Sequence, residues 1–266
     1  MKKADRFWHR VMVACCIVAI ACVGVLLYIL ASWRKNEAAL QAAANDPLLL
    51  EMTKEADYTA DAPAEPVPVP VDFPYLQGIN PDIYAWLVMP MSGQEYPVLQ
   101  NSEDSRTYLR RDIYGEYAAG GSLFTEALHN TRSFDDPCTV IFGHNMLSGA
   151  MFGSLERCMQ ELNLNDASDE KNYLTVYTPG GIRKYRILCA GPYSDDSILF
   201  HHSFSRPGEA DSFVDEMKNY PVDGFVCCSN RVPADDDSLL MLSTCYRLTT
   251  RNRYVVVAVL TEKYGV

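Results

Sequence analysis

The sequence predicts a mainly β domain of the α+β class, with added helices and strands that close into a barrel, preceded by an N-terminal transmembrane helix. The barrel is predicted because short β-prone runs recur beyond residue 70, while helical periodicity is confined to a few short stretches. The membrane helix is predicted because residues 11–33 form an uncharged apolar run long enough to cross a bilayer.

The flanks of the apolar run predict its orientation. Four basic residues and one acidic residue precede it within residues 1–10, whereas Arg34 and Lys35 follow it directly and Glu37 comes next. This bias places the N-terminus in the cytoplasm and the rest of the chain outside the cell. The alternative is a cleaved signal peptide with its cleavage site in the alanine-rich residues 38–44, but the run is long for that role.

A spacer follows the apolar run. Residues 34–56 are rich in Ala, Leu, Glu and Lys and predict a continuing helix, and residues 56–74 hold five prolines among acidic residues and valines, a composition typical of an extended linker. We therefore divide the chain into a cytoplasmic tail (1–10), a transmembrane anchor (11–33), a helical and Pro-rich acidic spacer (34–70) and an extracellular globular domain (71–266).

Within the globular domain, strand signals come first. Residues 84–88 and 96–99 are short β-prone runs, and residues 173–178 and 182–190 flank Pro179-Gly180-Gly181, which predicts a hairpin. Two further runs end at a histidine and at a cysteine, and a last run follows an arginine. Helical spacing is limited to residues 151–160 and 210–220.

Composition limits the classes of partner. The formal net charge of −11 argues against a nucleic-acid binder, which would need a basic face. Three of the nine cysteines lie in the apolar run, and the other six show no regular spacing. If one of those six is a reactive free thiol, an odd number remains. We expect mostly buried, reduced cysteines, with one disulfide as the open alternative.

Three β-prone runs each carry a reactive side chain at one end. Residues 239–244 lead into Cys245, residues 139–143 lead into His144, and Arg253 opens the run 254–259. A thiol, an imidazole and a guanidinium together are suited to acyl transfer through a thioester. We predict that Cys245 is the nucleophile, that His144 is the general acid and base, and that Arg253 stabilises an oxyanion or the substrate backbone.

Each of these residues also has a purely structural interpretation. A cysteine after an apolar strand is commonly buried core, a histidine after Phe-Gly can cap a turn, and Arg253 can be a surface charge whose role falls to Arg247 or Arg251. Asn145 either orients the loop that carries His144 or only stabilises the turn in that loop.

Metal sites are weakly supported by the sequence. His201-His202 has no third ligand at a zinc-like spacing. Asp235-Asp236-Asp237 is interpreted as a solvated loop, because calcium also needs ligands from elsewhere in the chain and the sequence identifies none. We expect no metal and no cofactor.

Taken in order, the motifs of residues 75–266 resemble the sortases, membrane-anchored cysteine transpeptidases of Gram-positive bacteria. The resemblance is carried by the Leu-Ser-Thr-Cys box ending at Cys245, by Gly-His-Asn around His144 and by the Arg-Tyr-Val-Val-Val strand from Arg253. Tyr108-Leu109 and residues 121–124 resemble the early barrel strands of the family, as does the segment 96–100. The connection 194–237, with its predicted helix, indicates class B.

The resemblance also implies a substrate site. Ser243, which shares a strand face with Cys245, and Thr244, Arg110 and Leu199 are predicted to bind the substrate, although Thr244 can instead pack internally. Class B relatives often carry asparagine at the position of Arg110 and an acidic residue at the position of Tyr246. These departures leave open whether the sorting motif is of the Asn-Pro-x-Thr or the Pro-Pro-x-Thr-Gly type.

The activity implied is that of a cysteine transpeptidase, a thiol-protease type of enzyme that cleaves a sorting signal of a surface protein after threonine. The acyl group would pass to an amine of a peptidoglycan precursor, or to a pilin amine if the enzyme polymerises pilins. A single-pass membrane protein with its catalytic domain outside the cell is expected. The alternatives are another exported cysteine protease and an inactive sortase-like scaffold.

Overall fold

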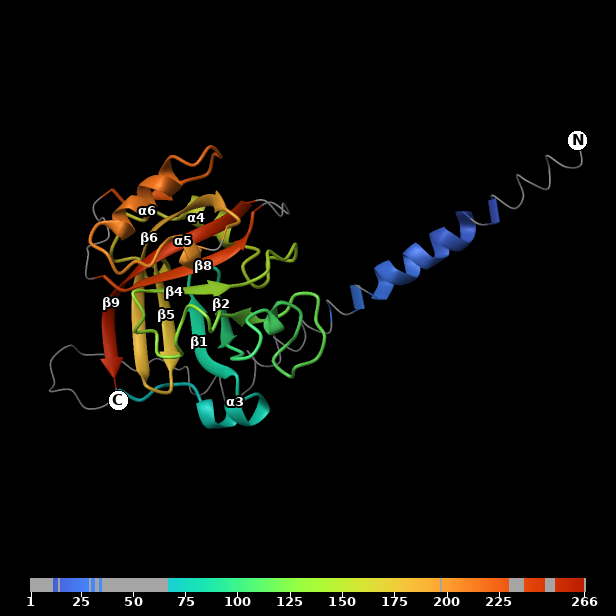
Figure 1. Ribbon diagram of the computed structural model, residues 1–266, viewed down its shortest axis with the longest axis horizontal. Coiled ribbons are helices and arrows are strands. Elements are labelled where there is room, and N and C mark those ends of the chain that lie inside the picture. The colour runs from blue at the N-terminus through green and yellow to red at the C-terminus, as the bar shows by residue number, and fades with distance from the viewer. Residues whose placement is uncertain are drawn as a thin grey trace, which may run out of the picture.

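The computed structural model describes residues 12–13, 15–28, 30–31, 34, 67–196, 198–229, 237–246 and 252–265 (Figure 1). Residues 15–28 are helical. Within the described part of the chain, no helix combines the length and the apolar character needed to cross a membrane. Nearly all of the predicted spacer lies outside the described residues.

The globular domain is built on a closed barrel. Its strands are β1 (Ile83–Met89), β2 (Gln94–Leu99), β3 (Leu123–Phe124), β4 (Cys138–Phe142), β5 (Tyr173–Thr178), β6 (Gly181–Ser194), β8 (Leu239–Cys245) and β9 (Asn252–Gly265). They follow the order β5-β1-β2-β3-β4-β8-β9-β6, and pairing of β5 with β6 closes the ring of eight. The short β7 (Val226–Cys227) pairs with β6 outside the ring. The predicted barrel is confirmed.

Helices flank the barrel (Figure 1). They are α3 (Phe73–Ile79), α4 (Leu155–Glu161), α5 (Ile198–His201) and α6 (Glu209–Lys218), with single 3-10 turns η1 (Thr107–Leu109) and η2 (Glu170–Asn172). The connection between β6 and β8 carries α5, α6 and β7 (Figure 1). The helix predicted at 210–220 is confirmed as α6, which buries Phe213, Val214 and Met217.

Two local predictions were wrong. Tyr108-Leu109 is not a strand but part of η1, because the buried Tyr108 donates its hydroxyl to Asp82 Oδ2 at 2.8 Å and so anchors a loop. The helix predicted from residue 151 begins only at Leu155. Met151 instead has a positive φ of 55° and bridges to Asn145, a conformation that a helix cannot include.

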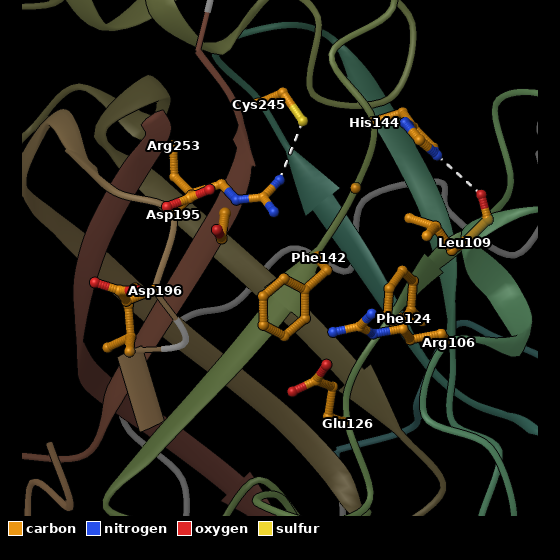
Figure 2. Close-up of a pocket in the computed structure, with 13 residues that line it drawn as sticks. Arg106, Leu109, Phe124, Glu126, Phe142, His144, Asp195, Asp196, Cys245 and Arg253 are labelled. Carbon is orange, nitrogen blue, oxygen red and sulfur yellow. Dashed lines mark hydrogen bonds between the residues drawn. The ribbon is translucent and has the colours of Figure 1, made fainter. Parts of the chain in front are cut away.

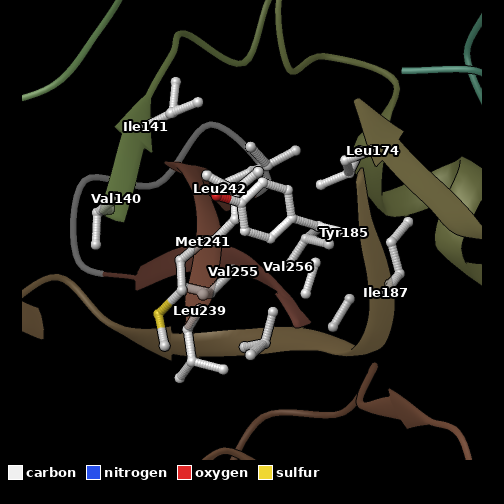
Figure 3. Packing of buried hydrophobic residues seen from close by; sticks show 14 of the residues in the cluster. Val140, Ile141, Leu174, Tyr185, Ile187, Leu239, Met241, Leu242, Val255 and Val256 are labelled. Atoms are coloured by element: carbon white, nitrogen blue, oxygen red, sulfur yellow. The ribbon is translucent and has the colours of Figure 1, made fainter. Parts of the chain in front are cut away.

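Strands β8 and β9, which carry Cys245 and Arg253, are buried in the core of the barrel. Leu239–Thr244 and Tyr254–Val259 are buried without a break, and Figure 3 shows Leu242, Tyr185 and Val256 gathered in one apolar cluster. Burial on both faces explains why these strands read as continuous apolar runs. No disulfide joins the nine cysteines, all of which lie among the described residues. Four of the six in the domain are buried, which agrees with the prediction of mostly buried cysteines.

Candidate active site

Strand register brings the three predicted catalytic residues to one end of the barrel. Cys245 is the last residue of β8 and pairs directly with Arg253 near the start of β9. On the other side of β8, β4 runs parallel, with Phe142 opposite Ser243. Because the two parallel strands end together, the chain leaves β4 through Gly143 and His144 beside the end of the cysteine strand (Figure 2).

Gly143 allows this exit. Its N–H donates to the carbonyl of Ser243 at 3.2 Å, which extends the β4–β8 pairing by one residue. A Cβ at this position would collide with the side chains of Leu123 and Phe152. The glycine therefore fixes how closely the His144 loop approaches the barrel core.

The guanidinium of Arg253 contacts the thiol. Arg253 Nη1 donates to Cys245 Sγ at 3.1 Å, and both residues are half-buried. Their direct pairing across the β8–β9 ladder places both side chains on the same face of the sheet. A fixed positive charge at this distance favours negative charge on the sulfur or on an oxygen that develops beside it.

The imidazole of His144 points towards a neighbouring loop. Because a carbonyl only accepts, Nε2 is the nitrogen that donates to Leu109 O, at 2.8 Å (Figure 2). Burial lowers the pKa of His144 below its ordinary value, and the positive charges of Arg110 and Arg253 lower it further, while the bond to Leu109 opposes the shift. His144 is therefore neutral at pH 7, with Nδ1 available as a base.

Asn145 joins the histidine loop to the cysteine strand. Its side-chain Nδ2 donates to the backbone carbonyl of Cys245 at 2.7 Å. Sequence reasoning offered a role for Asn145 in the His144 loop or its turn and did not foresee this contact. The only sequence signal was its position directly after His144.

A pocket of about 270 Å³ opens around these groups. Ser243, Cys245, His144 and Arg253 line it. The sequence pointed to no role for several further lining residues, which come from loops, from β3 and from the start of α5: Arg106, Phe124, Glu126, Asp195, Asp196 and Ile198.

The other predicted substrate-binding residues lie away from the pocket lining. Thr244 is buried, and Arg110 Nη1 donates to Ala119 O at 3.1 Å. Leu199 packs against the main apolar cluster beside the lining residue Ile198.

Some candidates of the sequence analysis cannot be placed. Arg247 and Arg251, the alternatives to Arg253, lie outside the described residues, as do Asp235 and Asp236. Among the described residues, no group of three or more His, Cys, Asp or Glu side chains is arranged to hold a metal ion.

Comparison with known proteins identifies relatives. No family model matches the chain. Sortase B of Listeria monocytogenes is 27% identical over 234 residues, which cover 86% of this chain and 88% of that protein. The solved Staphylococcus aureus sortase B–substrate complex has a TM-score of 0.57 at 25% identity and covers 71% of this chain and 84% of that one.

A Streptococcus pyogenes class B sortase involved in pilus biogenesis has a TM-score of 0.57 at 26% identity, covering 72% of this chain and 98% of that one. By sequence and by fold, the chain is similar to class B sortases. In this chain, the helix-bearing connection between β6 and β8 supplies Asp195, Asp196 and Ile198 to the pocket wall.

Proposed function

We propose that this chain is a class B sortase, a cysteine transpeptidase that cleaves a sorting signal after threonine and transfers the acyl group to a primary amine. The observation that carries the proposal is the 3.1 Å contact between Arg253 Nη1 and Cys245 Sγ in a pocket that His144 also lines. A buried structural cysteine would need neither a guanidinium nor an adjoining pocket.

In the first half-reaction, Cys245 Sγ attacks the threonine carbonyl carbon and the peptide C–N bond breaks. His144 Nδ1 takes the thiol proton and passes it to the leaving amine. Arg253 hydrogen-bonds to the developing oxyanion or to the substrate backbone. The product is a thioester on Cys245.

In the second half-reaction, His144 takes a proton from the incoming amine as that amine attacks the thioester. The proton returns to the sulfur, and Cys245 is regenerated as a thiol. Because one amide is exchanged for another through the thioester, the reaction needs no ATP. Attack by water instead of an amine would give the thiol-protease reaction at the same site.

The cellular setting is part of the proposal. The apolar run 11–33 would anchor the chain with its N-terminus inside, the spacer 34–70 would hold the domain off the membrane, and the domain 71–266 would act outside the cell. The sorting signal would then belong to a surface protein, and the acceptor would be a peptidoglycan-precursor amine. No cofactor is needed for these steps.

A second candidate is polymerisation of pilins through a lysine amine. It is favoured by the similarity to the Streptococcus pyogenes class B sortase involved in pilus biogenesis. Both candidates use the same acyl-enzyme, so they differ only in the amine that is accepted.

The test uses quenched peptides with Asn-Pro-x-Thr, Pro-Pro-x-Thr-Gly and Leu-Pro-x-Thr-Gly cores, incubated with the protein with and without an amine acceptor. Mass spectrometry should show an acyl adduct on Cys245 and a ligated product, both absent in Cys245→Ala. Cys227→Ala, which removes an exposed cysteine that does not line the pocket, is the matched control. The proposal fails if no peptide acylates Cys245 although a small reagent still alkylates that thiol.

A further inference from the structure

Two cysteines face each other across the short β6–β7 ladder. Cys189 of β6 pairs with Cys227 of β7. The neighbouring backbone bond runs from Cys228 N to Leu188 O at 2.8 Å, one residue outside the pair on each strand. In an antiparallel ladder this pattern makes Cys189 and Cys227 a non-hydrogen-bonded pair, the type in which opposite side chains lie closest.

The ladder spacing suits a covalent bond. Opposite residues in a non-hydrogen-bonded pair have Cα atoms about 4.5 Å apart, within the range of about 4.4–6.8 Å seen in disulfides. Cys228 is the next residue along the chain, so its side chain points to the opposite face of β7 and is buried. The register therefore selects Cys227, and not Cys228, as the partner of Cys189.

The two thiols also differ in chemistry. A hydrogen bond from Cys189 lowers the pKa of Cys227 to about 7, helped by Cys228 and by the charge of Lys218 and opposed by burial. The same bond and burial raise the pKa of Cys189. Cys227 is exposed and Cys189 is buried, so a soluble reagent reaches Cys227 first.

We propose that Cys189 and Cys227 are an oxidation site at which a low-molecular-weight disulfide produces a cross-strand disulfide. The Cys227 thiolate attacks one sulfur of the reagent, whose S–S bond breaks and releases one thiolate. Cys189 then loses its proton and attacks the mixed disulfide at Cys227 Sγ, releasing the second thiolate. The protein loses two electrons and two protons, and the reagent becomes two thiols.

The bond would close a loop of functional interest. Residues 190–226, which lie between the two cysteines, carry α5, α6 and the pocket residues Asp195, Asp196 and Ile198. The disulfide would link the C-terminal end of this segment, at β7, to β6 and would limit movement of the segment. Neither Cys189 nor Cys227 lines the pocket, so the site is independent of the transpeptidase chemistry.

The test starts from the unaltered full chain, reduced and then incubated with oxidised glutathione. A non-reduced peptide map should contain a peptide linked through Cys189 and Cys227, with a mass two hydrogens below the sum of the two free peptides. The oxidised protein should melt roughly 5 °C or more above the reduced protein, and dithiothreitol should reverse the shift. Repeating the map in Cys245→Ala removes interference from the pocket thiol.

Variants locate the bond. Cys227→Ser should abolish both the linked peptide and the melting shift, whereas Cys228→Ser should retain both. The proposal is overturned if glutathione remains on Cys227 as a stable mixed disulfide, if the bond joins other cysteines, or if neither cysteine reacts. Because the map is made on the unaltered chain, the result does not depend on how a variant folds.

Discussion

Replacing Arg253 with glutamine tests the central contact of the proposed mechanism. The substitution removes the charge and the Nη1 donor that lies 3.1 Å from Cys245 Sγ, while keeping an extended polar side chain. Gly143, His144 and the barrel strands are untouched, so a loss of activity would report on the guanidinium.

The size of the effect follows from the distance. Unit charges separated by 3.1 Å attract by about 5 kcal/mol at an effective dielectric constant near 20 and by about 1 kcal/mol in bulk water. Both residues are half-buried, which places the site between these limits. A loss of about 3–4 kcal/mol in transition-state stabilisation corresponds to a fall in kcat/KM of about 100- to 1,000-fold.

The assay is peptide cleavage and ligation under single-turnover conditions, together with the rate of alkylation of Cys245 by iodoacetamide at pH 7. Arg253→Lys should fall between the parent and Arg253→Gln, because lysine keeps the charge but not the planar fork. Arg157→Gln, an exposed change on α4, is the matched control. An Arg253→Gln enzyme with kcat/KM within about threefold of the parent would refute the assignment, since the structural argument requires at least about 1 kcal/mol.

Three further outcomes are expected. Asn145→Ala removes the 2.7 Å bond to the Cys245 carbonyl and should lower kcat/KM about tenfold and Tm by a few degrees, whereas unchanged values for both would contradict a positioning role. Burial lowers the pKa of His144 below its ordinary value of 6.5. Between the lowered pKa of the folded state and 6.5, the unfolded chain therefore binds more protons than the folded chain, and the free energy of unfolding should rise with pH up to about 6.5. Denaturant titrations across pH should show a shallower dependence in His144→Gln, and equal slopes would count against the shift. Gly143→Ala forces a Cβ against Phe152 and should lower the free energy of unfolding by about 1–3 kcal/mol, measured by calorimetry. An unchanged free energy of unfolding would show that the His144 loop moves away without cost and would contradict the argument.

The elements that the sequence predicted well are those governed by local rules. The hairpin of β5 and β6 follows from β-prone runs on both sides of a Pro-Gly-Gly turn, and α6 follows from helical spacing of apolar residues. Tyr108-Leu109 was mispredicted as a strand because the buried hydroxyl of Tyr108 bonds to Asp82, a contact between distant parts of the chain. Local propensity carries no information about such a partner.

For the site, the sequence by itself determined the residue types and their order: a histidine, a cysteine and an arginine, each at the end of a β-prone run. Only the tertiary structure decided that β4 lies parallel to β8 and β9 antiparallel to it, which brings these three strand ends together. It also decided the contact of Asn145 with Cys245, the pocket wall at Asp195 and Asp196, and the pairing of Cys189 with Cys227. These arrangements depend on register between strands far apart in sequence, which is set by burial and backbone pairing across the whole barrel.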